Sequence, residues 1–296
     1  SFSRAKRTPA SAGVRFAFPM SRLSPFPLAR STWCTALLTS LGILASQETR
    51  AASNWPSSLT RDPRGSFPDL RPARATYVYG WSGITAATSD VYFHRGDQRK
   101  FVLEGRGRTV GLARVLWRFD LDYRSAANAE TLRPLDTHQV ETVRGKRVET
   151  NLKFSDEGVS GSRVESNHAT PAVKDFNLEN LYDLHSAFLY LRSQPLRDHS
   201  VYRVAVYPAN SAYVATLTVV GREHLRVRAG SYNAIKLDLK LQRVSKKNEL
   251  EPHRKFKRAT IWISDDNDRM LLRIEGQIFV GTVTTELQSV TFERAQ

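Results

Sequence analysis

Residues 235–242 read Ile235-Lys-Leu-Asp-Leu-Lys-Leu-Gln242, with apolar and polar side chains alternating at every step. Successive side chains of a β-strand point to opposite faces of the sheet, so this period of two predicts a strand with one buried and one solvated face. We expect Leu237 and Leu239 to share the buried face and Lys240 to face solvent. Burial on one side only is typical of antiparallel sheets.

Similar strand signals recur along most of the chain. Runs rich in β-branched and aromatic residues are separated by short turn sequences such as Arg144-Gly145 and Ala229-Gly230. Strands that follow one another through short turns pair antiparallel, and the chain lacks the βαβ alternation of a parallel sheet. The predicted strands cover residues 76–81, 87–94, 100–106, 121–127, 137–143, 148–154, 158–164, 201–207, 213–220, 224–228, 235–242, 259–264 and 270–292.

Two segments have the spacing of a helix. Over about 178–191, four apolar residues recur at steps of 3, 4 and 3, which places them on one helix face. We expect this face to contact the sheet; its residues are Leu181, Leu184, Phe188 and Leu191. The opposite face, toward solvent or a cleft, carries Asp183, Ser186 and Tyr190. A shorter apolar pattern predicts a second helix near 112–118.

These elements predict a mainly β protein. About a dozen antiparallel strands cannot lie flat, because sheets twist and coil. We therefore expect a single large, strongly curved antiparallel sheet, an open or half barrel, over residues 75–293. The central helix is expected to pack on its concave face.

The N-terminal region has the order of a secretory leader. Met20 and Arg22 precede an apolar run over 33–45, and the small residues Ala51 and Ala52 follow. Basic, apolar and then small is the order of a signal peptide. The run is shorter than the roughly 18–20 apolar residues that a membrane-spanning helix needs.

We therefore expect residues 20–52 to be a cleaved signal peptide and residues 1–19 to be upstream readthrough. Residues 53–74, rich in Pro and Arg, are expected to form a flexible lead-in. The mature protein is then expected in the periplasm or cell envelope, without a transmembrane helix.

The chain is basic, with 44 Lys+Arg against 29 Asp+Glu and a formal net charge of +15. Residues 1–52 hold seven of the basic residues and one acidic residue, which leaves +9 for the expected mature protein. Export argues against nucleic acid, so the expected partner is lipid, glycan or another envelope protein, with peripheral membrane contact. The candidate residues for contact with an anionic surface are Lys246, Lys247, Arg254, Lys255, Lys257 and Arg258.

No motif for catalysis or metal binding stands out. The single cysteine, Cys34, lies in the expected leader, and the seven histidines lack metal-ligand spacing. There is no Gly-x-Ser-x-Gly elbow, so Asp183, His185 and Ser186 are interpreted as helix surface rather than as a triad. We expect no catalytic residue, no metal and no cofactor.

Four segments carry a resemblance to a known family. They are 77–84 (Tyr-Val-Tyr-Gly-Trp-Ser-Gly-Ile), 183–192 (Asp-Leu-His-Ser-Ala-Phe-Leu-Tyr-Leu-Arg), 227–236 (Val-Arg-Ala-Gly-Ser-Tyr-Asn-Ala-Ile-Lys) and 261–266 (Ile-Trp-Ile-Ser-Asp-Asp) followed by 272–274 (Leu-Arg-Ile). In this order, over about 75–292, they resemble the exported bacterial domain-of-unknown-function family numbered 3108. The resemblance implies an exported, mainly β protein and supplies no catalytic residue.

The resulting functional expectation is a monomeric, non-enzymatic envelope protein with an apolar cleft for a lipid-like or other anionic amphiphile. The candidate ligand-binding residues are Tyr77, Trp81, Asp183, Tyr190 and Arg192. One alternative is an envelope enzyme acting on cell-wall or glycan material, which needs convergent carboxylates such as Glu104, Asp120 and Asp122. Another is a structural interaction protein without a cavity.

The leader makes a direct prediction. Because cleavage follows the small residues after the apolar run, the mature N-terminus is expected between about residues 46 and 54. Terminal sequencing of the protein made by its own host measures this. An intact leader on a cytoplasmic protein would contradict it.

Overall fold

The computed structural model describes residues 54–97, 99–166, 172–173, 175–253, 256–278 and 281–293. All of them lie in one compact unit, Arg50–Gln296. The expected readthrough and signal peptide, residues 1–52, lie outside the described residues.

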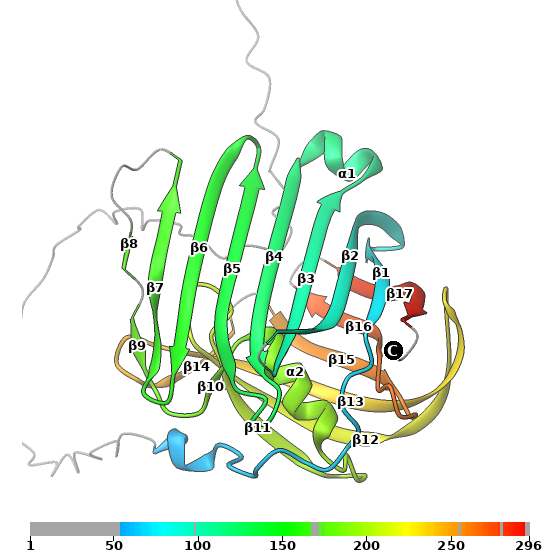
Figure 1. The fold of residues 1–296 in the computed structure, drawn as a ribbon. Coiled ribbons are helices and arrows are strands. Elements are labelled where there is room, and N and C mark those ends of the chain that lie inside the picture. The colour runs from blue at the N-terminus through cyan, green and yellow to red at the C-terminus, as the bar shows by residue number, and fades with distance from the viewer. Residues whose placement is uncertain are drawn as a thin grey trace, which may run out of the picture. The chain divides into compact units, whose positions relative to one another are not determined.

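The described residues form a 17-stranded sheet and two α-helices (Figure 1). In chain order the elements are η1 (Trp55–Ser58), β1 (Ala73–Trp81), β2 (Ile84–Gly96), β3 (Lys100–Thr109), α1 (Gly111–Leu116), β4 (Phe119–Asn128), β5 (Pro134–Val143), β6 (Lys146–Ser155), β7 (Gly158–Glu165), β8 (Ala172–Val173), β9 (Phe176–Asn177), β10 (Leu181–Tyr182), α2 (Leu184–Ser193), β11 (Val201–Val206), β12 (Tyr213–Val227), β13 (Gly230–Val244), β14 (Leu250–Pro252), β15 (Phe256–Ser264), β16 (Leu271–Ile278) and β17 (Thr282–Phe292).

The sheet has two arms, β2–β7 before α2 and β11–β17 after it. Within each arm the strands pair antiparallel with their neighbours. The short strand β10, which precedes α2 and belongs to neither arm, pairs parallel with β11. The arms join where β1 pairs with both β2 and β17, with Ala73 opposite Phe292 in the last strand. Among the described residues no ladder joins β7–β9 to β10, so the sheet stays open. The predicted mainly β fold with a curved antiparallel sheet is confirmed.

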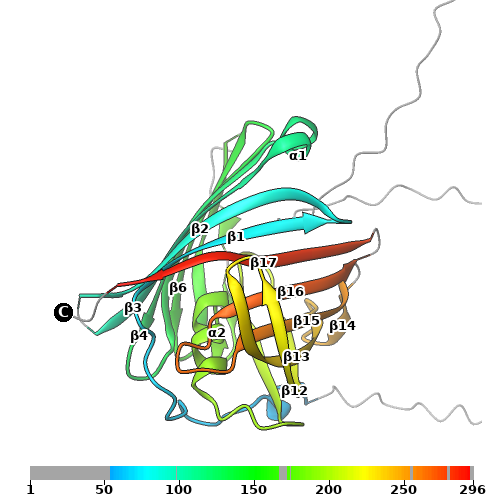
Figure 2. The ribbon, with the colours of Figure 1, turned by 90° about the vertical axis from the view of Figure 1, so that its right-hand side faces the viewer.

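Helix α2 lies between the two arms (Figure 2). One apolar cluster joins the arms around Tyr77, Phe93 and Leu272, and Leu189 of α2 belongs to it. Another packs α2 against β11–β13 and β15. A third bridges the open edges, because Leu152 of β6 belongs to the same cluster as residues of β11 and β12. Side-chain packing therefore connects the two edges of the sheet that no described backbone ladder joins.

The central helix exists but starts six residues later than predicted. Residues 181–182 pair with β11 as β10, which ends the extended chain at Asp183. Asp183 then caps α2: its carboxylate accepts from Ser186 N at 2.7 Å, and Asp183 N donates to Ser186 Oγ at 3.1 Å. This reciprocal capping box fixes the helix start.

The prediction of which helix face is buried was only partly right: Leu181 and Leu191 are buried as expected. Leu184, expected on the sheet, is 52% exposed, whereas Asp183, Ser186 and Tyr190 of the expected outer face are buried. The reason is that α2 is covered on almost every side, by both arms and by the segment before β1. Polar residues can be buried there because their hydrogen bonds are satisfied.

Two other boundaries differ from the sequence prediction. The predicted strand 270–292 is two strands, β16 and β17, with Gly281 at φ +85° just before β17. The predicted strands 213–220 and 224–228 are one strand, β12, in which the register shifts between Val219 and Gly221. A β-bulge of this kind bends a strand without ending it.

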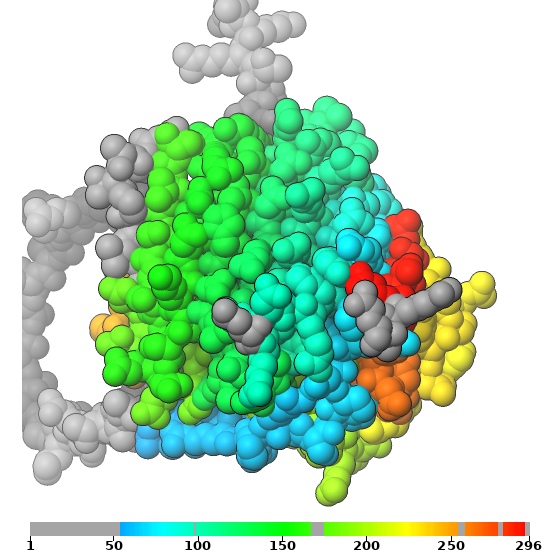
Figure 3. All heavy atoms as spheres, in the orientation of Figure 1, coloured from blue at the N-terminus to red at the C-terminus, as the bar shows by residue number. Residues whose placement is uncertain are grey.

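Residues 54–72, expected to be a flexible lead-in, instead form a strap along α2. Trp55, Leu59 and Leu70 of the strap are buried. The strap binds the end of α2 through its backbone: Phe67 N donates to Ser193 O at 3.3 Å. In Figure 3 it runs in blue along the lower edge of the outer face of β2–β7. Its prolines exclude it from the sheet but do not prevent packing.

Strand β13 allows a sharp test of the core. Leu237 is completely buried, Leu239 beside it is half-buried, and Lys240 is exposed. Leu237→Ala should therefore destabilise the fold by about 2–5 kcal/mol through lost burial and a cavity. Lys240→Ala is the control and should change stability by less than about 0.5 kcal/mol. Equal shifts in urea melts would show that the strand's register is wrong.

Candidate functional site

A buried carboxylate lies where α2 begins. Asp183 is fully buried, and its Oδ2 accepts hydrogen bonds from Tyr123 (3.2 Å), Thr137 (2.9 Å) and Ser125. Its Oδ1 accepts from the backbone and hydroxyl of Ser186. The donors come from β4, β5 and α2, so one side chain ties the helix to the first arm.

The charge on Asp183 is stabilised without an ion pair among the described residues. Hydrogen bonds to a charged acceptor are stronger than neutral ones, and an anion at a helix N-terminus also interacts favourably with the helix dipole. The same carboxylate acts on Tyr123: burial first, and the nearby Asp183 charge second, raise the pKa of that phenol well above its usual value. Tyr123 therefore remains a hydrogen-bond donor at neutral pH.

His185 lies beside this carboxylate. The ring is buried, with Nδ1 3.2 Å from Ser125 Oγ and no hydrogen-bond partner for Nε2. Burial lowers the pKa of His185, and the Asp183 charge only partly offsets this. His185 is therefore neutral at pH 7. Asp183, His185 and Ser186 were expected on the helix surface, and their burial corrects that interpretation.

The wall that holds Asp183 continues along the inner face of β3–β7. Cross-strand pairs place Gly105 opposite Tyr123, Gly107 opposite Leu121, and Thr150 opposite Arg163. We call this surface the inner wall; it comprises Gly105, Gly107, Leu121, Tyr123, Gln139, Glu141, Val148, Thr150, Arg163 and Glu165. Arg163 Nε lies 3.8 Å from Glu165 Oε1. Leu121, Tyr123, Gln139 and Val148 on it are only half-buried.

The inner wall carries one buried ion pair. Arg163 Nη2 lies 3.9 Å from Glu141 Oε2, and Arg163 Nη1 donates to Thr150 Oγ1 at 3.1 Å. Burial raises the pKa of Glu141, and the attraction of Arg163 opposes this only in part. Glu141 Oε2 is buried without a hydrogen-bond partner. An unsatisfied buried acceptor costs free energy, so this oxygen is suited to receive a donor.

The outer face of the same strands is charged and exposed. It carries Glu104, Arg106, Arg108, Asp122, Arg124, Arg147 and Lys153. The carboxylates that a glycan-cleaving enzyme would need lie here. Asp122 pairs with Arg106 at 3.2 Å and Asp120 with Arg114 at 2.9 Å. The alternative of a glycan-cleaving enzyme requires these carboxylates to converge in a pocket. On the exposed outer face they pair with arginines instead.

The five predicted ligand residues do not line one cleft. Tyr77 is core, and its hydroxyl donates to Leu271 O at 3.1 Å. Trp81 is half-buried at the end of β1. Tyr190 is buried in the cluster between α2 and the second arm. Asp183, by contrast, belongs to the inner wall's hydrogen-bond network.

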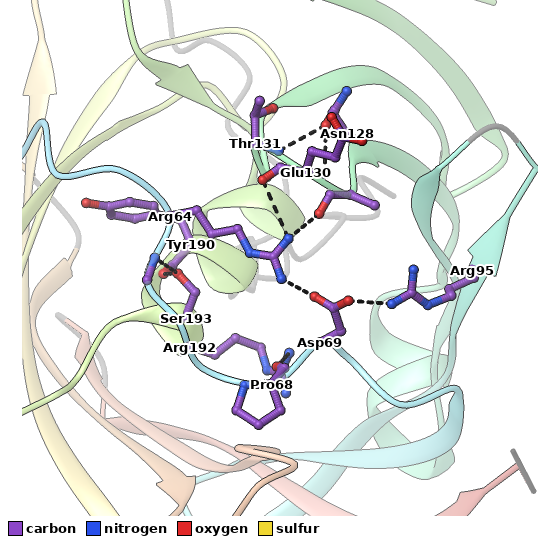
Figure 4. Close-up of polar contacts among 12 residues, drawn as sticks. Arg64, Pro68, Asp69, Arg95, Asn128, Glu130, Thr131, Tyr190, Arg192 and Ser193 are labelled. Atoms are coloured by element: carbon purple, nitrogen blue, oxygen red, sulfur yellow. Dashed lines mark hydrogen bonds and ion pairs between the residues drawn. The ribbon is translucent and has the colours of Figure 1, made fainter.

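Arg192 is buried beneath the strap. Its guanidinium donates to Pro68 O at 3.3 Å and to Asp268 O at 3.0 Å, and the strap itself is held by ion pairs of Asp69 with Arg64 and Arg95 (Figure 4). Burial lowers the pKa of Arg192 to about 10, which leaves it charged at neutral pH. The hollow beside it has about 10 Å³, room for about one water. The expected cleft between helix and sheet is therefore filled by the strap.

The basic patch predicted from the sequence is only partly described. Lys246 and Lys247 are exposed in the turn after β13, and Arg258 pairs with Asp238. Arg254, Lys255 and the side chain of Lys257 lie outside the described part of the chain. Contact of this patch with an anionic surface stays a prediction.

Two general features limit the chemistry. Within the described ranges, no three His, Cys, Asp or Glu side chains form a group that could hold a metal ion. No helix in the described part of the chain combines the length and apolarity needed to cross a bilayer. The site is a half-buried wall with a polar hub at Asp183, built by five strands, β3–β7, and the N-terminus of α2.

Comparison with known proteins identifies a matching family model and supports the fold. A family model described as "Protein of unknown function (DUF3108)" matches residues 76–288. No curated protein matches the chain. A solved beta-barrel-like protein of domain family DUF1849 from Brucella abortus is 13% identical with a TM-score of 0.53, covering 77% of this chain and 100% of that chain. A DUF1089 family protein from Pseudomonas aeruginosa is 10% identical with a TM-score of 0.36, covering 65% and 90%. The first likeness supports the fold alone, and the second carries no argument.

Sequence reasoning missed most of the inner wall. Its signals were present: Tyr123 and Ser125, like Thr137 and Gln139, are separated by two positions on predicted strands. Which face they occupy depends on the partner that covers it. Of the hydrogen-bond network beside the wall, only Asp183, His185 and Ser186 were singled out in advance, all three on the predicted helix.

The neutral state of His185 predicts a pH dependence. Its folded pKa lies below the unfolded value of about 6.5. Its contribution to stability is therefore fully present above that pH and is lost as the pH falls toward the folded pKa. One proton corresponds to a slope of at most about 1.4 kcal/mol per pH unit.

Urea unfolding of wild type and His185→Asn at several pH values between 5 and 8 measures this. The variant should lose part of the acid-side slope, whereas His224→Asn, at an exposed position, should keep it. An unchanged slope in His185→Asn would contradict the assignment.

Proposed function

This chain belongs to the DUF3108 family of proteins of unknown function, and we propose that it is an exported cell-envelope protein that binds a lipid-like or other anionic amphiphile on the inner wall of its curved sheet. Localisation in the periplasm or envelope rests on the leader-like order of residues 20–52.

The contrast between the two faces of β3–β7 carries this proposal. The outer face is exposed and charged, as expected for solvent contact. The inner wall has its charged side chains only on β5 and β7, at Glu141, Arg163 and Glu165, and it remains half-exposed at Leu121 and Val148. Ligand sites typically combine apolar surface with a few polar groups. An acyl chain would lie along Leu121 and Val148.

Two glycines give the wall its free space. A Cβ added at Gly107 would lie 3.7 Å from the nearest heavy atom, and one at Gly105 would lie 3.9 Å away. Both are ordinary contacts, so glycine is not required by crowding at either position. Their effect is to leave the β3 side of the inner wall, opposite Leu121 and Tyr123, without side chains, and a ligand would cover this surface.

The polar end of the ligand would meet the buried Arg163–Glu141 pair. The guanidinium can donate to an anionic or carbonyl oxygen. Glu141 Oε2, which receives no hydrogen bond from the described residues, can accept one from a hydroxyl or amide of the same head group. The preference for an anionic ligand rests on the excess of basic residues, which raises the rate of encounter with anions.

Filling the wall tests the proposal. Protein from its own host is extracted with organic solvent, and mass spectrometry of the extract should detect a bound amphiphile. Gly107→Leu should reduce its amount at least about tenfold, because each buried methylene of a displaced chain contributes about 0.8 kcal/mol. Glu104→Leu, on the outer face of the same strand, is the matched control and should retain the ligand.

Melting curves provide the second readout. Phosphatidylglycerol or a fatty acid should raise the melting temperature of wild type and of Glu104→Leu, but not of Gly107→Leu. No extractable amphiphile together with no thermal shift would reject binding. The chain would then fit the alternative of an interaction protein without a ligand.

A further inference from the structure

Exposed apolar side chains gather at one end of the first arm. Of the seven large hydrophobic residues exposed in the described part of the chain, four lie at this end. They are Ile84, Leu112, Val115 and Leu116, and Val115 is 83% exposed. We call these four residues the apolar knob. Scattered exposed apolar residues need no explanation, but a cluster marks a site of interaction.

The fold holds the knob in this position. Leu112, Val115 and Leu116 share one face of α1, because residues three and four apart are neighbours on a helix. Ala113 is buried on the other side. Val110 N donates to Ala86 O at 2.9 Å, which fixes α1 beside the start of β2, where Ile84 lies. In both ribbon views α1 projects at the end of the arm farthest from α2 (Figures 1 and 2).

Basic residues surround the knob. Residues 106–122 and 142–149, which form this end of β3–β6, contain seven Arg or Lys and three Asp or Glu, a net charge of +4. Asp122 pairs with Arg106, and Glu149 pairs with Arg147. Arg144 stacks on Trp117, with its Cζ 4.1 Å from the ring centroid, and donates to Leu116 O at 3.4 Å. Arg118 has 68% of its side chain exposed. The end of the arm is thus apolar at its tip and cationic around it.

We propose that the apolar knob docks on the surface of a membrane containing anionic phospholipid. Apolar side chains beside cations match a bilayer, where acyl chains lie beneath anionic head groups. Tryptophan with an adjacent arginine is typical of the head-group region.

A bilayer fits this surface better than a folded protein does. A stable protein–protein interface buries about 1,200–2,000 Å², which four side chains around one short helix cannot supply. A small group of apolar side chains such as the knob can insert into a bilayer, because the fluid acyl chains rearrange around it. This docking goes beyond amphiphile binding and does not depend on the inner wall being occupied.

Vesicle flotation tests the docking. The protein as its host processes it is mixed with vesicles of phosphatidylcholine containing about one third phosphatidylglycerol, and in parallel with phosphatidylcholine alone. Wild type should float with the anionic vesicles, at least tenfold more than with the neutral ones, and less as salt rises. The variant Leu112→Gln/Val115→Gln/Leu116→Gln should bind at least tenfold less.

The remaining exposed hydrophobic residues provide a matched control. Leu184→Gln/Val201→Thr/Val220→Thr removes the other three and should bind like wild type. Because all six positions are exposed, both variants should melt near the wild-type temperature. Val115→Trp should strengthen binding and blue-shift its fluorescence with anionic vesicles.

Three results would overturn the proposal. The first is absence of wild-type binding to anionic vesicles. The second is equal binding by the knob variant and wild type. The third is self-association of wild type, measured by sedimentation and lost in the knob variant, without vesicle binding; this would assign the knob to a second copy of the chain.

Discussion

The structure depends on one buried carboxylate that joins parts of the chain about 50 residues apart. Asp183 receives hydroxyl hydrogen bonds from β4 and β5 and caps the helix that leads into the second arm. A buried charge costs several kcal/mol unless it is hydrogen-bonded, so these donors must all be in place when the helix docks. That requirement selects one position and one orientation of α2 between the arms. The sheet, in which no ladder among the described residues joins β7–β9 to β10, needs such a fixed element inside it.

The strap fixes the C-terminal end of α2, as Asp183 fixes its start. Asp183 holds the start of α2, whereas Ser193 and Arg192 hold its end against residues 65–68. Asp69 pairs with both Arg64 and Arg95, and hydrogen bonds and attraction from these arginines outweigh burial and lower the pKa of Asp69. The helix is thus enclosed, and the space beside it is not available to a ligand. The candidate binding surface is therefore the inner wall and not the cleft that was expected beside the helix.

The first arm then combines two surfaces of different character. Its inner wall is half-exposed and carries its charges on β5 and β7, and its far end carries the apolar knob beside basic residues. The second arm contributes the larger part of the apolar core around β12 and β13. In the proposed function, the surfaces that interact are therefore separate from the largest part of the apolar core. This separation is physically reasonable, because a surface kept half-exposed for binding cannot also supply full hydrophobic burial.

The sequence by itself determined the class of fold, the family and the location of most strands. Alternation at residues 235–242 identifies a strand, because successive side chains of a strand point to opposite faces whatever the partner. Burial follows the alternation only in part, since Asp238 is buried whereas Leu239 is half-buried. Turns such as Arg144-Gly145, both with positive φ in the structure, are likewise local.

Only the tertiary structure decided the faces of α2, the course of the strap and the composition of the inner wall. Leu184 and Asp183 look apolar and polar in the sequence, yet the first is exposed and the second buried. Local pattern predicts burial when an element has one covered face. It fails for α2, which is covered on nearly all sides, because there hydrogen-bond partners from distant strands decide which polar side chains can be buried.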